Sequence, residues 1–133
     1  MIILALASAI TGNITSATFI AKNTISVGAS TVIYGCYGGL IAYMIINWKT
    51  LGKMRSQLCC IIGIILFISI FMSLGGNVDL AGHLGGLVGG VTCGLGIFPG
   101  IKPKLKAFTI GGLGLLAAYI LTMFLVFFLV IQN

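Results

Sequence analysis

The sequence predicts an all-α, polytopic membrane protein that folds as a bundle of about five transmembrane helices. Its residues are 59% hydrophobic and only 6% charged, and the mean hydropathy is +1.25. Seven Lys and Arg residues and one acidic residue are too few to cover the surface of a soluble domain. A spanning helix needs about 20 mostly apolar residues, and the alternating pattern of a membrane β-barrel is absent.

Apolar runs of spanning length recur along the whole chain, which we interpret as one domain over residues 1–133. The first run is predicted to stay in the membrane, because it lacks the positively charged start of a cleaved signal peptide. The predicted spans are Met1–Ile20, Val27–Trp48, Leu58–Leu74, Leu80–Phe98 and Phe108–Ile131.

Positive charge lies on one side of this predicted bundle. The connectors after the second and fourth runs hold every Lys and Arg except Lys22. Because cytosolic loops are enriched in Lys and Arg, we expect a cytosolic N-terminus and a C-terminus on the opposite side. The second and fourth runs then both enter the membrane from the non-cytosolic face. Ser30 and His83 each lie about one turn inside that face.

Glycines mark the faces on which these two runs are expected to meet. Gly82, Gly86, Gly90 and Gly94 recur every fourth residue in the fourth run. Gly35 and Gly39 form a matching pair in the second run. Such small-residue stripes let helix backbones approach closely in lipid. We therefore predict that Gly35, Gly39, Gly82, Gly86 and Gly90 pack these two helices together.

The chain's single histidine, His83, and its single acidic residue, Asp79, stand at the head of the longer stripe. An ionisable residue inside the membrane is by default a functional candidate. A serine nucleophile needs a base such as histidine within hydrogen-bond reach, so Ser30 and His83 form a candidate catalytic dyad. Asp79 lies one turn nearer the surface and is not expected to complete a triad.

Two further residues fit this dyad. Gly28 leaves space above Ser30 and opens backbone N–H groups at the helix start, where they can stabilise an oxyanion. Tyr34 is four residues after Ser30, on the same helix face, where its ring can stack on the imidazole. A bland interpretation stays open at this point: Ser30 bonds to its own helix, and His83 is simply solvated.

Other chemistries find little support in the composition. No acidic cluster or Cys/His set with metal-ligand spacing occurs, so no metal or cofactor is expected. The basic residues flank hydrophobic runs, which indicates membrane orientation and contact with the lipid bilayer, not nucleic-acid binding. The cysteines lie in apolar runs without a C-x-x-C pair, and we interpret them as buried thiols. They are Cys36, Cys59, Cys60 and Cys93.

The segment Gly28-Ala29-Ser30 with Tyr34 and Gly35, followed by Gly82-His83-Leu84-Gly85-Gly86, resembles the rhomboid family of intramembrane serine proteases. The family motifs are G-x-S-G on the fourth core helix and an A-H-x-x-G type pattern on the sixth. The resemblance covers about residues 1–98, as core helices three to six, with 108–131 as an extra C-terminal helix. It implies Ser30 as nucleophile, His83 as general base, Tyr34 packed on the histidine, and the Ser30 N–H in the oxyanion site. It also implies transmembrane protein substrates.

The sequence departs from the family pattern in two ways. Thr31 replaces the last Gly of G-x-S-G, and Gly82 replaces the usual Ala before the histidine. The first two core helices are absent, and with them the H-x-x-x-N motif, whose side chains donate to the oxyanion. Losing one such donor typically lowers the rate by about 10²–10³.

These departures leave several interpretations open. The chain is either a fragment of a longer protease or a degenerate form that cleaves poorly. The main alternative function is an inactive rhomboid-like protein that binds client transmembrane helices. A third is a small transporter or scaffold in which His83 is incidental.

Overall fold

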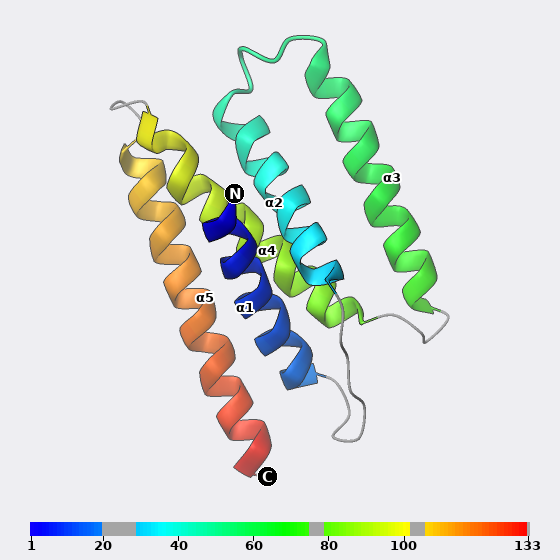
Figure 1. Cartoon of the computed structure of the whole chain (residues 1–133), viewed down its shortest axis with the longest axis vertical. Coiled ribbons are helices and arrows are strands. Elements are labelled where there is room, and N and C mark those ends of the chain that lie inside the picture. The colour runs from blue at the N-terminus through cyan, green and yellow to red at the C-terminus, as the bar shows by residue number, and fades with distance from the viewer. Residues whose placement is uncertain (20–28, 75–78, 102–105, 133) are drawn as a thin grey trace.

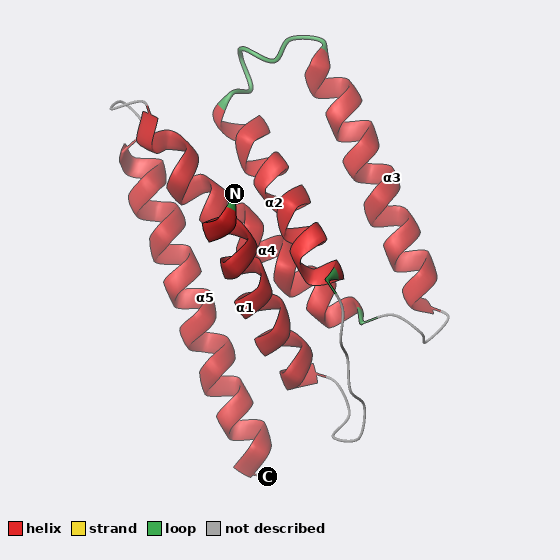
Figure 2. Cartoon of the chain, in the orientation of Figure 1, coloured by secondary structure: helices red, strands yellow, loops and turns green. Residues whose placement is uncertain are grey.

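The computed structural model describes residues 1–19, 29–74, 79–101 and 106–132, and these residues form a bundle of helices (Figure 1). The described part of the chain contains no strand (Figure 2), so the predicted all-α fold is confirmed. The elements are α1 (Ile2–Phe19), α2 (Ser30–Ile46), α3 (Met54–Leu74), α4 (Leu80–Ile97), the 3₁₀ turn η1 (Phe98–Ile101) and α5 (Lys106–Gln132).

Four of these helices are long and apolar enough to cross a membrane, namely α1, α3, α4 and α5. Helix α2 is apolar but shorter, with 17 residues. Helix α3 begins at Met54, four residues before the apolar run that predicted it. Hydropathy marks only the part of a helix that suits hydrocarbon, whereas the backbone hydrogen bonds continue into the polar interface.

The turn between α2 and α3 is held by a backbone feature and a ring contact. Gly52 has a φ of +49°, a left-handed conformation that glycine adopts without steric cost. The guanidinium carbon of Arg55 lies 5.0 Å from the centre of the Trp48 ring, which is a cation–π distance. Trp48 and Arg55 therefore join the two sides of this turn.

Helix α4 is the centre of the bundle, because it packs on α1, α2 and α5. Helix α3 lies to one side and contacts the other helices sparsely (Figure 1). Helices α2 and α4 begin at the same end of the bundle, whereas α1, α3 and α5 finish there. The residues of the candidate dyad lie at this shared end.

The interior is small and polar, and the exterior is large and apolar. Buried residues include many glycines together with Ser8, Thr11, Thr15 and Thr31. Large apolar side chains on α3 and α5 are exposed, including Phe67, Phe71, Leu121 and Phe124. This distribution suits lipid, where helices associate by close backbone packing because the hydrocarbon tails are as apolar as leucine.

Most of the buried hydroxyl groups in the described residues are satisfied within their own helices. Ser8 donates to the carbonyl oxygen of Leu4 at 2.7 Å, and Thr18 donates to that of Ile14 at 2.7 Å. In hydrocarbon no water is available to satisfy a polar group. These local hydrogen bonds therefore let hydroxyl side chains line the helix interfaces.

The prediction that all four thiols are buried is wrong for three of them. Cys93 is buried, whereas Cys36, Cys59 and Cys60 are exposed. The sequence pattern placed them correctly in apolar helices. In lipid, however, an apolar helix has no reason to turn its cysteines inward, because the surroundings are as apolar as the interior.

Candidate active site

Helices α2 and α4 lie so close that glycine hydrogens occupy the space where side chains would begin. A Cβ atom added to Gly86 would collide with the backbone carbonyl of Thr31, and one added to Gly90 with that of Gly35. A Cβ atom on Gly94 would lie 3.3 Å from the Cα of Gly39. The residue numbers of the contacting pairs thus rise together along the two helices, which means that α2 and α4 run parallel. Ser30 and His83, near the start of each helix, lie at the same end.

Helix α1 packs on a second glycine face of α4, which the sequence analysis did not identify. A Cβ atom on Gly85 would lie 2.5 Å from the Oγ1 atom of Thr15, and one on Gly89 would collide with the hydroxyl of Thr11. The available signal was the pair of doublets Gly85-Gly86 and Gly89-Gly90, because adjacent glycines point to two different faces of a helix.

The start of α4 is fixed by Asp79. Its Oδ1 atom accepts a hydrogen bond from the N–H of Gly82 at 2.8 Å, as is usual for a residue that caps a helix N-terminus. The N–H of His83 donates to the carbonyl oxygen of Asp79 at 3.1 Å. A Cβ atom on Gly82 would collide with the Asp79 carboxylate. Gly82 therefore makes room for this cap, in addition to lying on the stripe.

The His83 side chain lies against α2. Its ring stacks on that of Tyr34, with 4.2 Å between the ring centres and 11° between the planes. Tyr34 also meets Tyr37 edge-on, at 6.0 Å. His83 is only 7% exposed, and its Nδ1 atom is buried without a hydrogen-bond partner in the described part of the chain. An unpaired buried nitrogen costs about 1–3 kcal/mol, so it marks a position where function and stability conflict.

Ser30 is the first residue of α2 and is half-buried. It lies one turn before Tyr34. Ala29 provides no side-chain cap, and the first backbone bond of this turn runs from the N–H of Val32 to the carbonyl oxygen of Ala29 at 3.1 Å. The N–H groups of Ser30 and Thr31 precede that bond, as the first N–H groups of any helix do. Gly28 lies outside the described residues.

The described residues hold no hydrogen bond between Ser30 and His83. Catalytic hydrogen bonds are often long in the absence of substrate and tighten only in the complex. The site is therefore a serine and a histidine brought to the same end of two parallel helices, with the imidazole held by Tyr34.

The Thr31 side chain packs on α1. Thr31 is 6% exposed, and a Cβ atom on Gly12 would lie 2.8 Å from the Thr31 Cβ. The same added atom would lie 2.9 Å from the carbonyl oxygen of Gly82. Gly12 of α1, Thr31 of α2 and Gly82 of α4 thus meet at one junction next to Ser30.

Comparison with known proteins identifies a family that this chain matches. The family model of the Rhomboid domain matches residues 1–100. Rhomboid-like protease 1 of Toxoplasma gondii is 37% identical over 80 residues, which are 59% of this chain and 27% of that protein. Rhomboid-like protease 3 of the same organism is 36% identical over 81 residues, 58% of this chain and 29% of that protein. No solved structure matches.

The chain thus spans less than a third of the length of these curated relatives. The domain match ends at residue 100, so α5 lies beyond it. Within the match lie the stacked pair Tyr34 and His83 and the parallel helices that carry Ser30 and His83. Several helices are able to cross a membrane, as expected of a multi-pass integral membrane protein. The chain belongs to the rhomboid family.

Proposed function

We propose that this chain carries the catalytic dyad of an intramembrane serine endopeptidase, with Ser30 as nucleophile and His83 as general base. Its substrates would be transmembrane proteins, cut near the non-cytosolic face. Four described basic residues support this orientation, because they lie at the end of the bundle opposite Ser30 and His83: Lys49, Lys53, Arg55 and Lys106. Residues 1–98 would correspond to core helices three to six of the family, and 108–131 to an added helix.

The reaction is an acyl transfer in two stages. The Oγ atom of Ser30 attacks the carbonyl carbon of the scissile peptide bond while His83 accepts the hydroxyl proton. The C–N bond then breaks, and His83 returns the proton to the leaving amine. In the second stage a water molecule attacks the acyl-serine ester while His83 accepts its proton. The ester C–O bond then breaks, His83 returns the proton to the Ser30 Oγ atom, and the other fragment leaves with a free carboxyl group.

The observation that carries this proposal is the state of His83. A histidine with a purely structural role would be expected to have both ring nitrogens hydrogen-bonded to protein or to water. Here the ring is buried, held by Tyr34, and has an unpaired nitrogen. Tyr34 fixes the plane of the ring, and Asp79 fixes the turn that carries it. The imidazole is therefore oriented before any substrate arrives, as a general base must be.

One departure from the family pattern bears on the strength of catalysis. Thr31 occupies the position of a family glycine, but its side chain packs on Gly12. It therefore fills the junction between α1 and α2. The N–H groups at the start of α2 are the backbone donors that this chain offers to an oxyanion. Gly28 would leave the space above them open.

A serine-reactive fluorophosphonate probe tests the dyad directly, on the full chain purified in detergent. Wild-type protein is expected to be labelled, and Ser30→Ala and heat-denatured protein are expected to remain unlabelled. His83→Ala is expected to label far more slowly. Ser69→Ala is the matched control, because the Ser69 hydroxyl donates to the carbonyl oxygen of Ile65 in its own helix. Labelling that persists in Ser30→Ala, or its absence in folded wild type, would contradict the proposal.

The alternative is an inactive rhomboid-like protein that binds client transmembrane helices. The absence of a Ser30–His83 hydrogen bond among the described residues favours it. Capture of a transmembrane client peptide separates the two functions. Capture that survives both Ser30→Ala and His83→Ala, from a wild type that the probe does not label, would support the inactive form.

A further inference from the structure

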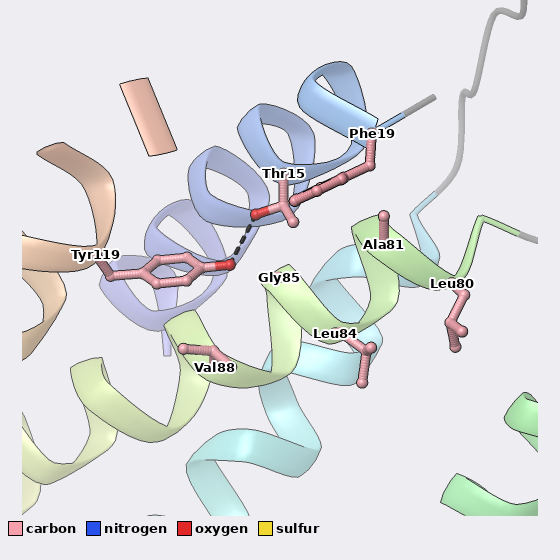
Figure 3. A pocket seen from close by; sticks show the side chains of 8 residues that line it. All are labelled: Thr15, Phe19, Leu80, Ala81, Leu84, Gly85, Val88 and Tyr119. Carbon is pink, nitrogen blue, oxygen red and sulfur yellow. Dashed lines mark hydrogen bonds between the residues drawn. The ribbon is translucent and has the colours of Figure 1, made fainter. Parts of the chain in front are cut away.

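Helix α5 is joined to α1 by a hydrogen bond between two side chains. The Oη atom of Tyr119 lies 2.8 Å from the Oγ1 atom of Thr15 (Figure 3). The other hydroxyl hydrogen bonds within the described residues run from a Ser or Thr to a backbone carbonyl of the same helix. The Tyr119–Thr15 bond therefore differs from them, because it links two helices that are far apart in the sequence.

The direction of this bond follows from counting hydrogens. The Thr15 hydroxyl also lies 2.7 Å from the carbonyl oxygen of Thr11, which can only accept. A threonine hydroxyl has one hydrogen to donate, and Thr11 receives it. Tyr119 must therefore donate its hydrogen to Thr15. Replacing Tyr119 by Phe removes this donor and leaves the Thr15–Thr11 bond intact.

Thr15 rests directly on the turn of α4 that follows His83. A Cβ atom on Gly85 would lie 2.5 Å from the Thr15 Oγ1, 2.7 Å from the Thr15 Cβ and 2.9 Å from the Thr11 carbonyl oxygen. On the other face of the same turn, Gly86 meets the backbone of Thr31 in α2. The turn of α4 that begins just after His83 is thus held between Thr15 of α1 and Thr31 of α2.

Helix α5 does not pack tightly against this turn of α4. An apolar groove of about 360 Å³ separates α5 from the start of α4. Figure 3 shows its lining residues, with the Tyr119 hydroxyl directed at Thr15 above Gly85. Helix α5 touches α4 closely at Gly112, where an added Cβ would lie 2.8 Å from the Thr92 carbonyl oxygen. Tyr119 is seven residues further along, about 10 Å of helix.

We propose that Tyr119 is a positioning residue: its hydroxyl holds Thr15 on Gly85 and so fixes the turn of α4 that carries His83. Helix α5, which lies beyond the residues matched by the Rhomboid domain, thereby helps to orient the general base. The effect on catalysis rests on the proposed function, whereas the effect on His83 does not.

The test compares Tyr119→Phe with Tyr43→Phe, both in the full chain. Tyr43 is an exposed tyrosine on α2, so its variant removes the same hydroxyl away from Thr15. His83 is the chain's only histidine, so histidine-selective isotope labelling gives imidazole NMR signals without ambiguity. Tyr119→Phe is expected to shift or broaden these signals, and Tyr43→Phe to leave them in place.

Fluorophosphonate labelling of Ser30 gives the second readout. Tyr119→Phe is expected to slow labelling about threefold, the factor that corresponds to an average interhelical hydrogen bond in a membrane protein. In a Thr15→Val background, which lacks the acceptor, Tyr119→Phe is expected to have no further effect. Thr15→Ser keeps the acceptor hydroxyl. With Tyr119 present, this variant is expected to match wild type in both the imidazole signals and the labelling rate, unlike Thr15→Val. The comparison separates loss of the hydrogen bond from loss of the fold.

Each other outcome overturns one idea or the other. Imidazole signals that Tyr119→Phe and Tyr43→Phe leave equally unchanged would refute the positioning role. Equal effects of Tyr119→Phe with and without the Thr15 hydroxyl would refute it as well. A third outcome separates the two ideas. If the probe never labels wild-type protein, but Tyr119→Phe still changes the imidazole signals as expected, the positioning of His83 is upheld and the proposed protease activity is contradicted.

Discussion

Substitution of Gly90 by Ala tests the closest approach in the bundle. A Cβ atom at this position would lie 2.7 Å from both the Cα and the carbonyl carbon of Gly35, and closer still to the carbonyl oxygen. Ordinary van der Waals contact begins at about 3.4 Å. Because these are backbone atoms of another helix, no side-chain rotation relieves the overlap. Helices α2 and α4 must separate locally by at least about 0.7 Å, the difference between these two distances.

The expected loss in free energy of unfolding is about 1–3 kcal/mol, the usual cost of overpacking a well-packed interior. Unfolding of the full chain by sodium dodecyl sulfate in mixed micelles, followed by circular dichroism, measures it. Gly114→Ala in α5 is the control, because no atom lies within 4 Å of its added Cβ. Alanine favours a helix over glycine by about 0.8–1.0 kcal/mol, so this variant should be as stable as wild type or more so.

The comparison between the two glycines decides the question. If Gly90→Ala unfolds at the same detergent fraction as Gly114→Ala, the α2–α4 contact does not hold the bundle together. The parallel arrangement of the two helices that carry Ser30 and His83 would then lose its physical basis. Gly63→Ala in α3, which also meets open space, shows whether the result depends on the choice of control helix.

Three further predictions follow from contacts at and around the site. Asp79→Ala should lower the free energy of unfolding by about 0.5–2 kcal/mol, because it removes the cap on the Gly82 N–H; Asp79→Asn, which keeps an acceptor oxygen, should lower it less in the same detergent titration. Tyr34→Phe keeps the ring that stacks on His83, so fluorophosphonate labelling should persist, whereas Tyr34→Ala should reduce it; equal labelling of the two variants would argue against a role for the stack. A membrane-permeant maleimide should modify Cys36, Cys59 and Cys60 in folded protein and spare Cys93 until detergent unfolds the chain, and early modification of Cys93 in a Cys93-only variant would contradict its burial.

Much of the fold could be predicted from hydropathy and glycine spacing. Apolar runs predict spanning helices because the hydrocarbon thickness fixes their length, and each predicted run matches one described helix to within four residues at either end. The every-fourth glycines Gly86, Gly90 and Gly94 predict close packing because it requires the absence of a side chain. The parallel arrangement of α2 and α4 was predicted by a different argument, from the charges of the connectors.

Apart from the stack of Tyr34 on His83, contacts between side chains on different helices could not be predicted in the same way. The bond between Tyr119 and Thr15 joins residues separated by most of the chain, and each residue type is common in membrane helices. The second glycine face, at Gly85 and Gly89, was visible only as doublets. The roles of Ser30 and His83 remain predictions, because spacing and depth place them at one end of the bundle without fixing the distance between them.

The regular spacing of the glycines does not by itself define a single register between α2 and α4. If α4 slid by four residues along α2, about 6 Å, Gly82, Gly86 and Gly90 would meet Thr31, Gly35 and Gly39. The two stripes would fit almost as well as they do now, so they bring the helices together without choosing between neighbouring registers. The contacts that do not repeat make that choice. The stack of Tyr34 on His83 exists in one register alone, so the pair that orients the imidazole also selects the alignment of the helices around it.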